Sequence, residues 1–280
     1  MRSMEEGRTR RGIAFTVRGS GPALLWLPGY VIPARAFHGV VDRFAEEYTC
    51  ITVDHRGSGR SRLGVLPVTT ASMAADAVSV LDELSVDRAH VVGASLGGMV
   101  AQELAIRHPG RVLSVALVST TAGGVDAQAP SVPDLVAGLR RAARGIKVPF
   151  HATLGAVVVQ GWAASTHDAA ARVSRIAVPT LVLHGTEDEL VPGSNAELLA
   201  ARIAGAELTF VRGAGHLLLL DADTGIQQLR RWLSSQETRR PVASGQALPL
   251  REVVTDPWRQ VAAQTLPLQR LLSGRVRLFR

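Results

Sequence analysis

Residues 93–97 have the sequence Gly-Ala-Ser-Leu-Gly and lie between an apolar run at 89–92 and a helix-like segment at 96–107. The run is short and ends in two valines, which favours a buried strand. A turn that leads from a strand directly into a helix is so tight that the neighbours of the serine can carry almost no side chain. The sequence therefore predicts a strand, a sharp turn and a helix, with the Ser95 hydroxyl close to the positive helix N-terminus.

This turn makes Ser95 a candidate nucleophile. A serine hydroxyl reacts well only when a base accepts its proton and a third group orients that base. In enzymes with this kind of turn, an acid and then a histidine follow the serine along the chain. We therefore looked for both downstream of Ser95.

The candidate acid follows a second buried strand, expected at 178–183 and introduced by proline. Asp188 is the preferred acid, and Glu187 and Glu189 are weaker alternatives. The candidate base is His216, because a glycine-rich turn presents it directly after a third expected strand at 206–211.

The other histidines and the single cysteine lack such a setting. Cys50 lies in an apolar strand-like run, so we expect a small buried side chain rather than a nucleophile. We expect the seven remaining histidines to be surface or packing residues: His38, His55, His90, His108, His151, His167 and His184.

Apolar runs and helical segments alternate along much of the chain. Further strands are expected at 11–18 (an edge strand), 23–27, 50–53 and 112–118, and further helices at 34–46, 69–84 (capped by Thr70) and 218–233. Continuous apolar strands that alternate with helices predict an α/β fold with a mostly parallel sheet and helices on both faces. Ligands bind at the carboxyl ends of such strands, where we expect Ser95, Asp188 and His216 to meet.

The alternation breaks between residues 122 and 175, which we interpret as a small helical cap over the site; an ordinary surface excursion is the alternative. A helix is expected at 135–144, followed by an apolar segment at 153–164. Phe150 and Trp162 are large apolar residues of the cap. They either line a substrate pocket or pack the cap helices.

The predicted core thus consists of residues 1–121 and 176–235, and residues 236–280 form a basic C-terminal extension. The extension holds eight arginines and three acids, so it carries most of the net charge of +7. Its four prolines interrupt any long helix. Two interpretations stay open: a disordered, mobile basic segment, or one that docks through apolar residues such as Trp258 and Leu271.

Composition and charge narrow the class of protein. With 46% apolar residues the chain can build a large core. We find no apolar run of membrane-spanning length and no signal-peptide pattern at the N-terminus. Because the core itself is almost neutral, the charge does not favour nucleic-acid binding. We expect a cytoplasmic protein that acts on a small-molecule substrate without a nucleic-acid or membrane partner; the oligomeric state is not predicted.

Four motifs carry a family resemblance. They are Asp-x-Arg-Gly-x-Gly-x-Ser at 54–61, Gly-x-Ser-x-Gly-Gly at 93–98, Pro-Thr-Leu-x-x-x-Gly-x-x-Asp at 179–188 and Gly-x-Gly-His at 213–216. In this order they resemble the α/β-hydrolase fold superfamily, particularly small bacterial serine esterases and lactonases such as the 3-oxoadipate enol-lactonases. The resemblance covers about residues 12–233 and leaves the extension out.

The resemblance implies a role for further residues. It assigns the oxyanion hole to the backbone N–H groups of Tyr30 and Leu96, and it gives Asp54 and Arg56 a structural role beside the site. The family has His-Gly and an aromatic residue after the first buried strand, whereas this chain has Pro28 in place of that histidine. This departure affects the loop that supplies an oxyanion donor rather than proton transfer.

The sequence therefore predicts a serine hydrolase of a carboxylic ester, lactone or thioester that works through an acyl-enzyme, without a cofactor or metal. A carbon–carbon bond hydrolase or an acyltransferase on the same scaffold is the first alternative. A ligand-binding or cyclisation protein with low turnover is the second. The motifs do not identify the substrate.

Overall fold

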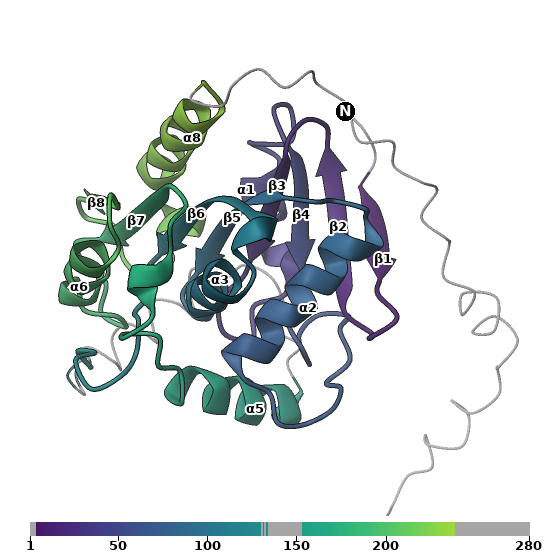
Figure 1. Cartoon of the computed structure of the whole chain (residues 1–280), viewed down its shortest axis with the longest axis horizontal. Coiled ribbons are helices and arrows are strands. Elements are labelled where there is room, and N and C mark those ends of the chain that lie inside the picture. Colours follow the sequence, from purple (N-terminus) through teal and green to yellow (C-terminus); the bar gives the residue numbers. More distant parts are fainter. Residues whose placement is uncertain (1–3, 130, 132, 134–152, 239–280) are drawn as a thin grey trace, which may run out of the picture. The chain divides into compact units, whose positions relative to one another are not determined.

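The computed structural model describes residues 4–129, 131, 133 and 153–238, and the structural statements below concern these residues. An eight-stranded sheet lies at the centre, in the order β1-β2-β4-β3-β5-β6-β7-β8 (Figure 1). Its strands are β1 (Glu5–Arg8), β2 (Ala14–Gly19), β3 (Ala23–Leu27), β4 (Thr49–Val53), β5 (Ala89–Ala94), β6 (Val112–Val118), β7 (Thr180–Gly185) and β8 (Glu207–Val211). Strand β2 is antiparallel to β1 and β4, and all neighbours from β4 to β8 are parallel.

Helices cover both faces of this sheet. The helices are α1 (His38–Val41), α2 (Thr70–Glu83), α3 (Leu96–Arg107), α5 (Leu154–Ser165), α6 (Ser194–Arg202), α7 (Leu218–Asp221) and α8 (Asp223–Thr238), with short 3-10 turns η1 (Ala34–Phe37), η2 (Pro109–Arg111) and η3 (Val173–Arg175). One apolar cluster joins the sheet to α2, α3 and α6, and a second joins it to α1, α7 and α8. In Figure 1, α2 and α3 cross in front of the strands, and α5 lies below them.

Successive residues of a strand point into different clusters, as the pleat requires. In β3, Leu25 belongs to the first cluster, whereas Leu24 and Trp26 belong to the second, and all three are buried. Burial on both faces explains why the central strands are continuously apolar. The predicted α/β fold with a mostly parallel, two-sided sheet is confirmed.

Several predicted boundaries were wrong near the N-terminus. Strand β1 was not predicted, and because it pairs with β2, the strand expected at the edge is the second in the sheet. The helix expected at 34–46 is only η1 and α1 followed by turns, and Gly39 in its middle lowers helix propensity. Helix α2 is capped by Thr69 instead of Thr70: Thr69 Oγ1 accepts from Ser72 N, and Ser72 Oγ accepts from Thr69 N.

The closing helix also differs from the prediction. It is divided into α7 and α8 because Ala222 between them has an extended backbone. Helix α8 continues to Thr238, past the boundary expected after residue 235. Glu237 Oε1 lies 2.5 Å from His90 Nε2, and His90 Nδ1 lies 2.7 Å from Ser114 Oγ, so the last turn of α8 is attached to β5 and β6. Among the described residues, no helix has the length and apolar character needed to cross a bilayer.

Two buried histidines make the stability of the fold depend on pH. Burial lowers the pKa of His55 to about 4, although its hydrogen bond to the Pro28 carbonyl opposes this, and burial also lowers the pKa of His167 to about 4. Both are therefore neutral in the folded protein near pH 7. Between pH 6.5 and 4 the unfolded chain binds more protons than the folded one, so stability falls as the pH falls.

We expect the free energy of unfolding to decrease by about 2 kcal/mol per histidine between pH 7 and pH 5. Guanidinium unfolding at both pH values measures the change. The variant His167→Gln keeps a polar side chain opposite Thr70 Oγ1, which lies 3.0 Å from His167 Nδ1. It should show a smaller pH dependence than the wild type. An equal dependence in both proteins would contradict the role given to His167.

Candidate active site

The turn at Ser95 has the tight geometry that the sequence predicts. Ser95 joins β5 to α3 with φ 54° and ψ −118°, a left-handed backbone that a non-glycine residue rarely adopts. A Cβ atom on Gly97 would lie 1.9 Å from the Leu27 carbonyl oxygen, and one on Gly93 would lie 2.3 Å from the Gly97 oxygen. Only glycine fits at either position. The Ser95 N–H donates to Val118 O at 2.8 Å, which attaches the turn to the end of β6.

Three expected site residues come together at the carboxyl ends of β5, β7 and β8. Ser95 Oγ lies 2.9 Å from His216 Nε2, and His216 Nδ1 lies 2.9 Å and 3.1 Å from the two carboxylate oxygens of Asp188. A carboxylate accepts hydrogen bonds, so we assign the proton to Nδ1. Nε2 is then free to accept the proton of the Ser95 hydroxyl.

The Asp188 side chain is fully buried, and its carboxylate is held by the chain around it. Oδ1 accepts hydrogen bonds from Leu190 N and Val191 N, each at 2.9 Å. Burial by itself would raise the pKa of Asp188, but the hydrogen bond from His216, the charge of that imidazole and the Val191 N–H outweigh it. The pKa of Asp188 therefore lies below its usual value, and the group is ionised near pH 7.

The two expected oxyanion donors flank the same serine. Leu96 is the first residue of α3, where a backbone N–H has no partner within the helix. Tyr30 follows β3 in the loop that begins with Pro28. Gly29 of this loop contacts the nucleophile, because a Cβ on it would lie 3.4 Å from Ser95 Cβ. In the part of the chain that the structure describes, neither the Tyr30 N–H nor the Leu96 N–H donates a hydrogen bond.

Sequence reasoning treated His184 as a packing residue and missed its contact with the candidate acid. His184 is the penultimate residue of β7 and is completely buried. Its Nε2 donates to Val191 O at 2.9 Å and lies 3.3 Å from Asp188 Oδ2. His184 therefore fixes the turn that carries Asp188. Its position four residues before the acid is the only sequence signal that points to this contact.

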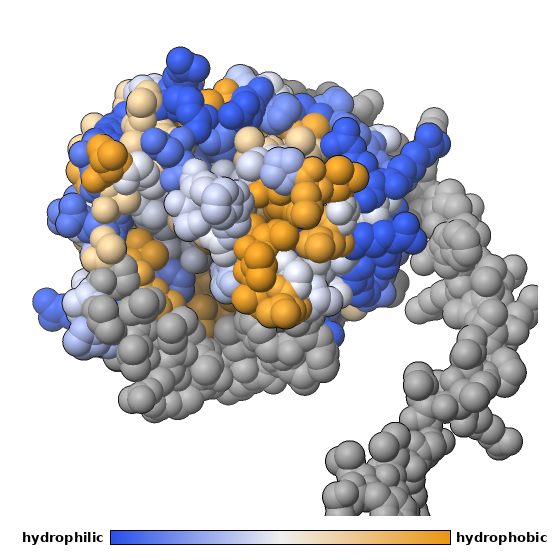
Figure 2. All heavy atoms as spheres, turned by 90° about the horizontal axis from the view of Figure 1, so that it is seen from below, coloured by the Kyte–Doolittle hydropathy of each residue, from blue (hydrophilic) through white to orange (hydrophobic). Residues whose placement is uncertain are grey.

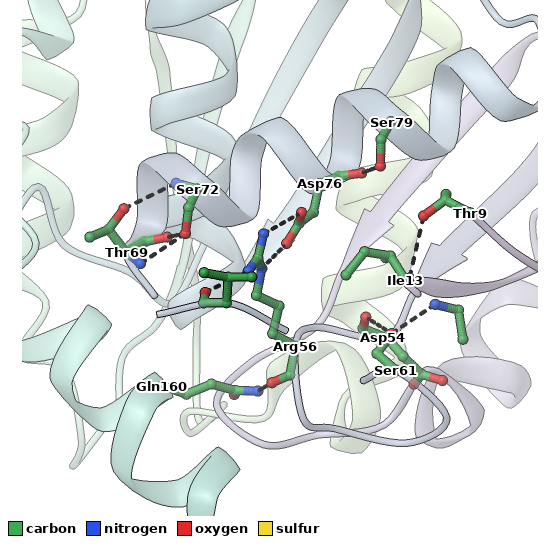
Figure 3. A network of polar contacts seen from close by, with 12 residues as sticks. Thr9, Ile13, Asp54, Arg56, Ser61, Thr69, Ser72, Asp76, Ser79 and Gln160 are labelled. Carbon is green, nitrogen blue, oxygen red and sulfur yellow. Dashed lines mark hydrogen bonds and ion pairs between the residues drawn. The ribbon is translucent and has the colours of Figure 1, made fainter. Parts of the chain in front are cut away.

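Asp54 and Arg56, for which the resemblance implied a structural role, hold the loops beside the site (Figure 3). The Asp54 carboxylate accepts from Ala34 N at 2.7 Å and from Arg60 N at 3.0 Å. The Arg56 guanidinium pairs with both carboxylate oxygens of Asp76 on α2, at 2.5 Å and 2.8 Å. These contacts join the segments after β3 and β4 to each other and to α2.

The described part of the expected cap is α5, which matches the apolar segment at 153–164. Figure 2 shows apolar side chains gathered on the face seen from below, where α5 lies in Figure 1, and Leu154 and Val158 are among the exposed residues. Trp162 is 61% exposed on this helix, so its role in a substrate pocket stays a prediction. Phe150 and the helix expected at 135–144 lie outside the described residues.

Comparison with known protein families is consistent with this geometry. A family model of the alpha/beta hydrolase fold matches residues 22–161, which include Ser95, Tyr30 and Leu96. A model of serine aminopeptidases of family S33 matches residues 151–223, which include Asp188 and His216.

Individual relatives have different names and reactions. A putative non-heme haloperoxidase of Mycobacterium phage D29 is 30% identical over 239 residues, which cover 73% of this chain and 85% of that protein. The dihydrolipoyllysine-residue acetyltransferase component of the acetoin cleaving system of Cupriavidus necator is 29% identical over 204 residues, 63% of this chain. The match spans about half, 54%, of that longer protein. The crystal structure of the enol-lactonase from Burkholderia xenovorans superposes with a TM-score of 0.72 at 22% identity, covering 82% of this chain and 100% of the enzyme.

Proposed function

The chain belongs to the α/β-hydrolase fold family, and we propose that it is a serine hydrolase that cleaves a carboxylic ester, lactone or thioester of a small molecule. One observation carries the proposal: the continuous hydrogen-bonded contacts from Ser95 Oγ through His216 to Asp188 at one edge of the sheet. A serine, a histidine and a buried carboxylate in this relation form a nucleophile, its base and the group that orients the base.

In the proposed reaction, Ser95 Oγ attacks the carbonyl carbon while its proton moves to His216 Nε2. The carbonyl oxygen becomes an oxyanion, which the N–H groups of Tyr30 and Leu96 stabilise. His216 then gives its proton to the leaving oxygen or sulfur, and an acyl-enzyme remains. Water attacks the acyl-enzyme by the same route in reverse, with His216 again accepting and returning one proton. Asp188 stabilises the imidazolium formed in both steps.

The substrate class rests on chemistry that this set of residues can perform unaided. An acyl-enzyme forms readily from an activated carbonyl with a good leaving group, which esters, lactones and thioesters all provide. The similarity to an enol-lactonase supports a small ester-like substrate, whereas the similarity to an acetyltransferase component keeps acyl transfer as an alternative. The two reactions share the acyl-enzyme and differ only in the acceptor that attacks it.

A covalent probe tests the proposal directly. We expect a fluorophosphonate to modify the purified protein once, on Ser95, and p-nitrophenyl acetate and simple lactones to be hydrolysed. Peptide mass spectrometry locates the adduct, and product analysis with added methanol separates hydrolysis from acyl transfer. Labelling at another residue, or no labelling of folded protein that also fails to turn over any ester, lactone or thioester, would overturn the proposal.

A further inference from the structure

A polar residue lies on the buried face of the otherwise apolar helix α5. Gln160 is completely buried, in line with the buried Ala156 and Ala163, while Val158 is mostly exposed on the outer face (Figure 2). A buried amide is costly unless its hydrogen-bonding groups find partners. The contacts of Gln160 therefore indicate why a glutamine occupies this position.

Gln160 bridges two loops that follow neighbouring strands of the sheet. Its Oε1 accepts a hydrogen bond from Val31 N at 2.8 Å, in the loop after β3. Its Nε2 donates to Arg56 O at 2.7 Å and to Ser58 Oγ at 2.8 Å, in the loop after β4. Figure 3 shows the side chain reaching from α5 to the Arg56 carbonyl, while the Arg56 guanidinium is paired with Asp76 on α2. The amide is thus held at one end by an anchored loop.

The other end of the amide holds the loop that lies against the nucleophile. Val31 has φ 50°, a left-handed conformation that is strained for a β-branched residue. Such a conformation persists only where surrounding contacts fix it, and the Val31 N–H is fixed by Gln160. The preceding residue, Tyr30, donates from its hydroxyl to Val157 O of α5 at 2.7 Å. Two consecutive residues of this loop are therefore attached to α5, and Gly29 contacts Ser95.

We propose that Gln160 is a positioning residue that keeps the Tyr30 N–H aimed at the oxyanion. The proposal rests on the proposed function, because Tyr30 is an oxyanion donor only in a reaction at Ser95. It gives α5 a second task besides covering the site: the helix sets the conformation of the donor loop. The alternative is that Gln160 only fastens α5 to the core, with no effect on the transition state.

The variant Gln160→Met separates the two roles, because methionine has a similar length but cannot hydrogen-bond Val31 N or Arg56 O. With p-nitrophenyl acetate we expect kcat to fall about ten- to a hundredfold, somewhat less than for outright loss of a donor, and KM to change less than about threefold. Inhibition by 1,1,1-trifluoroacetone should weaken in proportion to kcat. Ser95 Oγ adds to the carbonyl of this ketone, its proton passes to His216, and the adduct carries an oxyanion. The pH profile should keep the wild-type shape, since His216 and Asp188 are untouched.

Two further variants make the result decisive. Val158→Ala on the exposed face of α5 is the matched control and should retain wild-type kcat and inhibition. Tyr30→Phe removes only the hydroxyl contact to Val157 O; it tests the same loop if Gln160→Met does not fold, and should lower kcat and inhibitor affinity together by a few-fold. The proposal is overturned if folded Gln160→Met keeps wild-type kcat and inhibition, or if Gln160→Met is unfolded and Tyr30→Phe is unchanged. Failure of the proposed function would appear separately, as wild-type protein that neither turns over nor labels at Ser95.

Discussion

Replacement of Ser95 by alanine is expected to abolish covalent turnover while the fold stays intact. Removing the hydroxyl removes the attacking atom, and a serine of this kind accounts for a factor of ~10³ or more in rate. Alanine should fit, because it is smaller than serine and the turn already holds Ala94 beside it. The left-handed backbone at this position is as unfavourable for serine as for alanine, so the substitution adds no new strain.

The measurement is kcat with p-nitrophenyl acetate, together with fluorophosphonate labelling and the melting temperature of the variant. Ser79→Ala is a matched control, since Ser79 lies on α2 and its hydroxyl bonds only the Asp76 carbonyl. That control should keep wild-type activity. If Ser95→Ala retains activity within tenfold of the wild type, Ser95 is not the nucleophile.

The turn at Ser95 could be predicted because its constraints are local. Glycine at 93 and 97 is required by contacts within a few residues and with the neighbouring strand, and the small-residue pattern is therefore visible in the sequence. The strands of the parallel sheet were predicted for a similar reason: burial on both faces makes each of them a continuous apolar run. Strand β1 escaped prediction because Glu5–Arg8 has no apolar pattern and is defined only by its pairing with β2.

His184 and Gln160 could not be predicted because their roles come from contacts between distant segments. Gln160 meets residues more than a hundred positions earlier in the chain, and no local pattern specifies those partners. The one available signal was a glutamine among apolar residues on the buried face of a helix. Similarly, the attachment of Glu237 to His90 places the end of α8 beyond the predicted core boundary. Long-range polar contacts of this kind refine a site that the sequence locates only approximately.

The choice among three consecutive acids leads to the second prediction. The sequence 187–189 is Glu-Asp-Glu, and only Asp188 has its carboxylate within hydrogen-bonding distance of His216 among the contacts of the described residues. We expect Asp188→Asn to lower kcat/KM by at least ~10². Glu187→Gln and Glu189→Gln serve as matched controls of equal chemical change and should be nearly silent. A damaging effect of either control, with an active Asp188→Asn, would assign the acid to the wrong residue.

The surroundings of Asp188 explain why asparagine is harmful even though it is almost the same size. Leu190 N and Val191 N both donate to Oδ1, so the oxygen of an asparagine amide would occupy that place. Its NH2 group would then replace Oδ2, 2.9 Å from His216 Nδ1, where it can only donate. His216 would have to accept at Nδ1 and carry its proton on Nε2, which faces Ser95 Oγ. In that tautomer the imidazole cannot take the serine proton, and the imidazolium would also lose its neighbouring negative charge. A pH–rate profile should therefore show that raising the pH does not restore wild-type kcat/KM in Asp188→Asn.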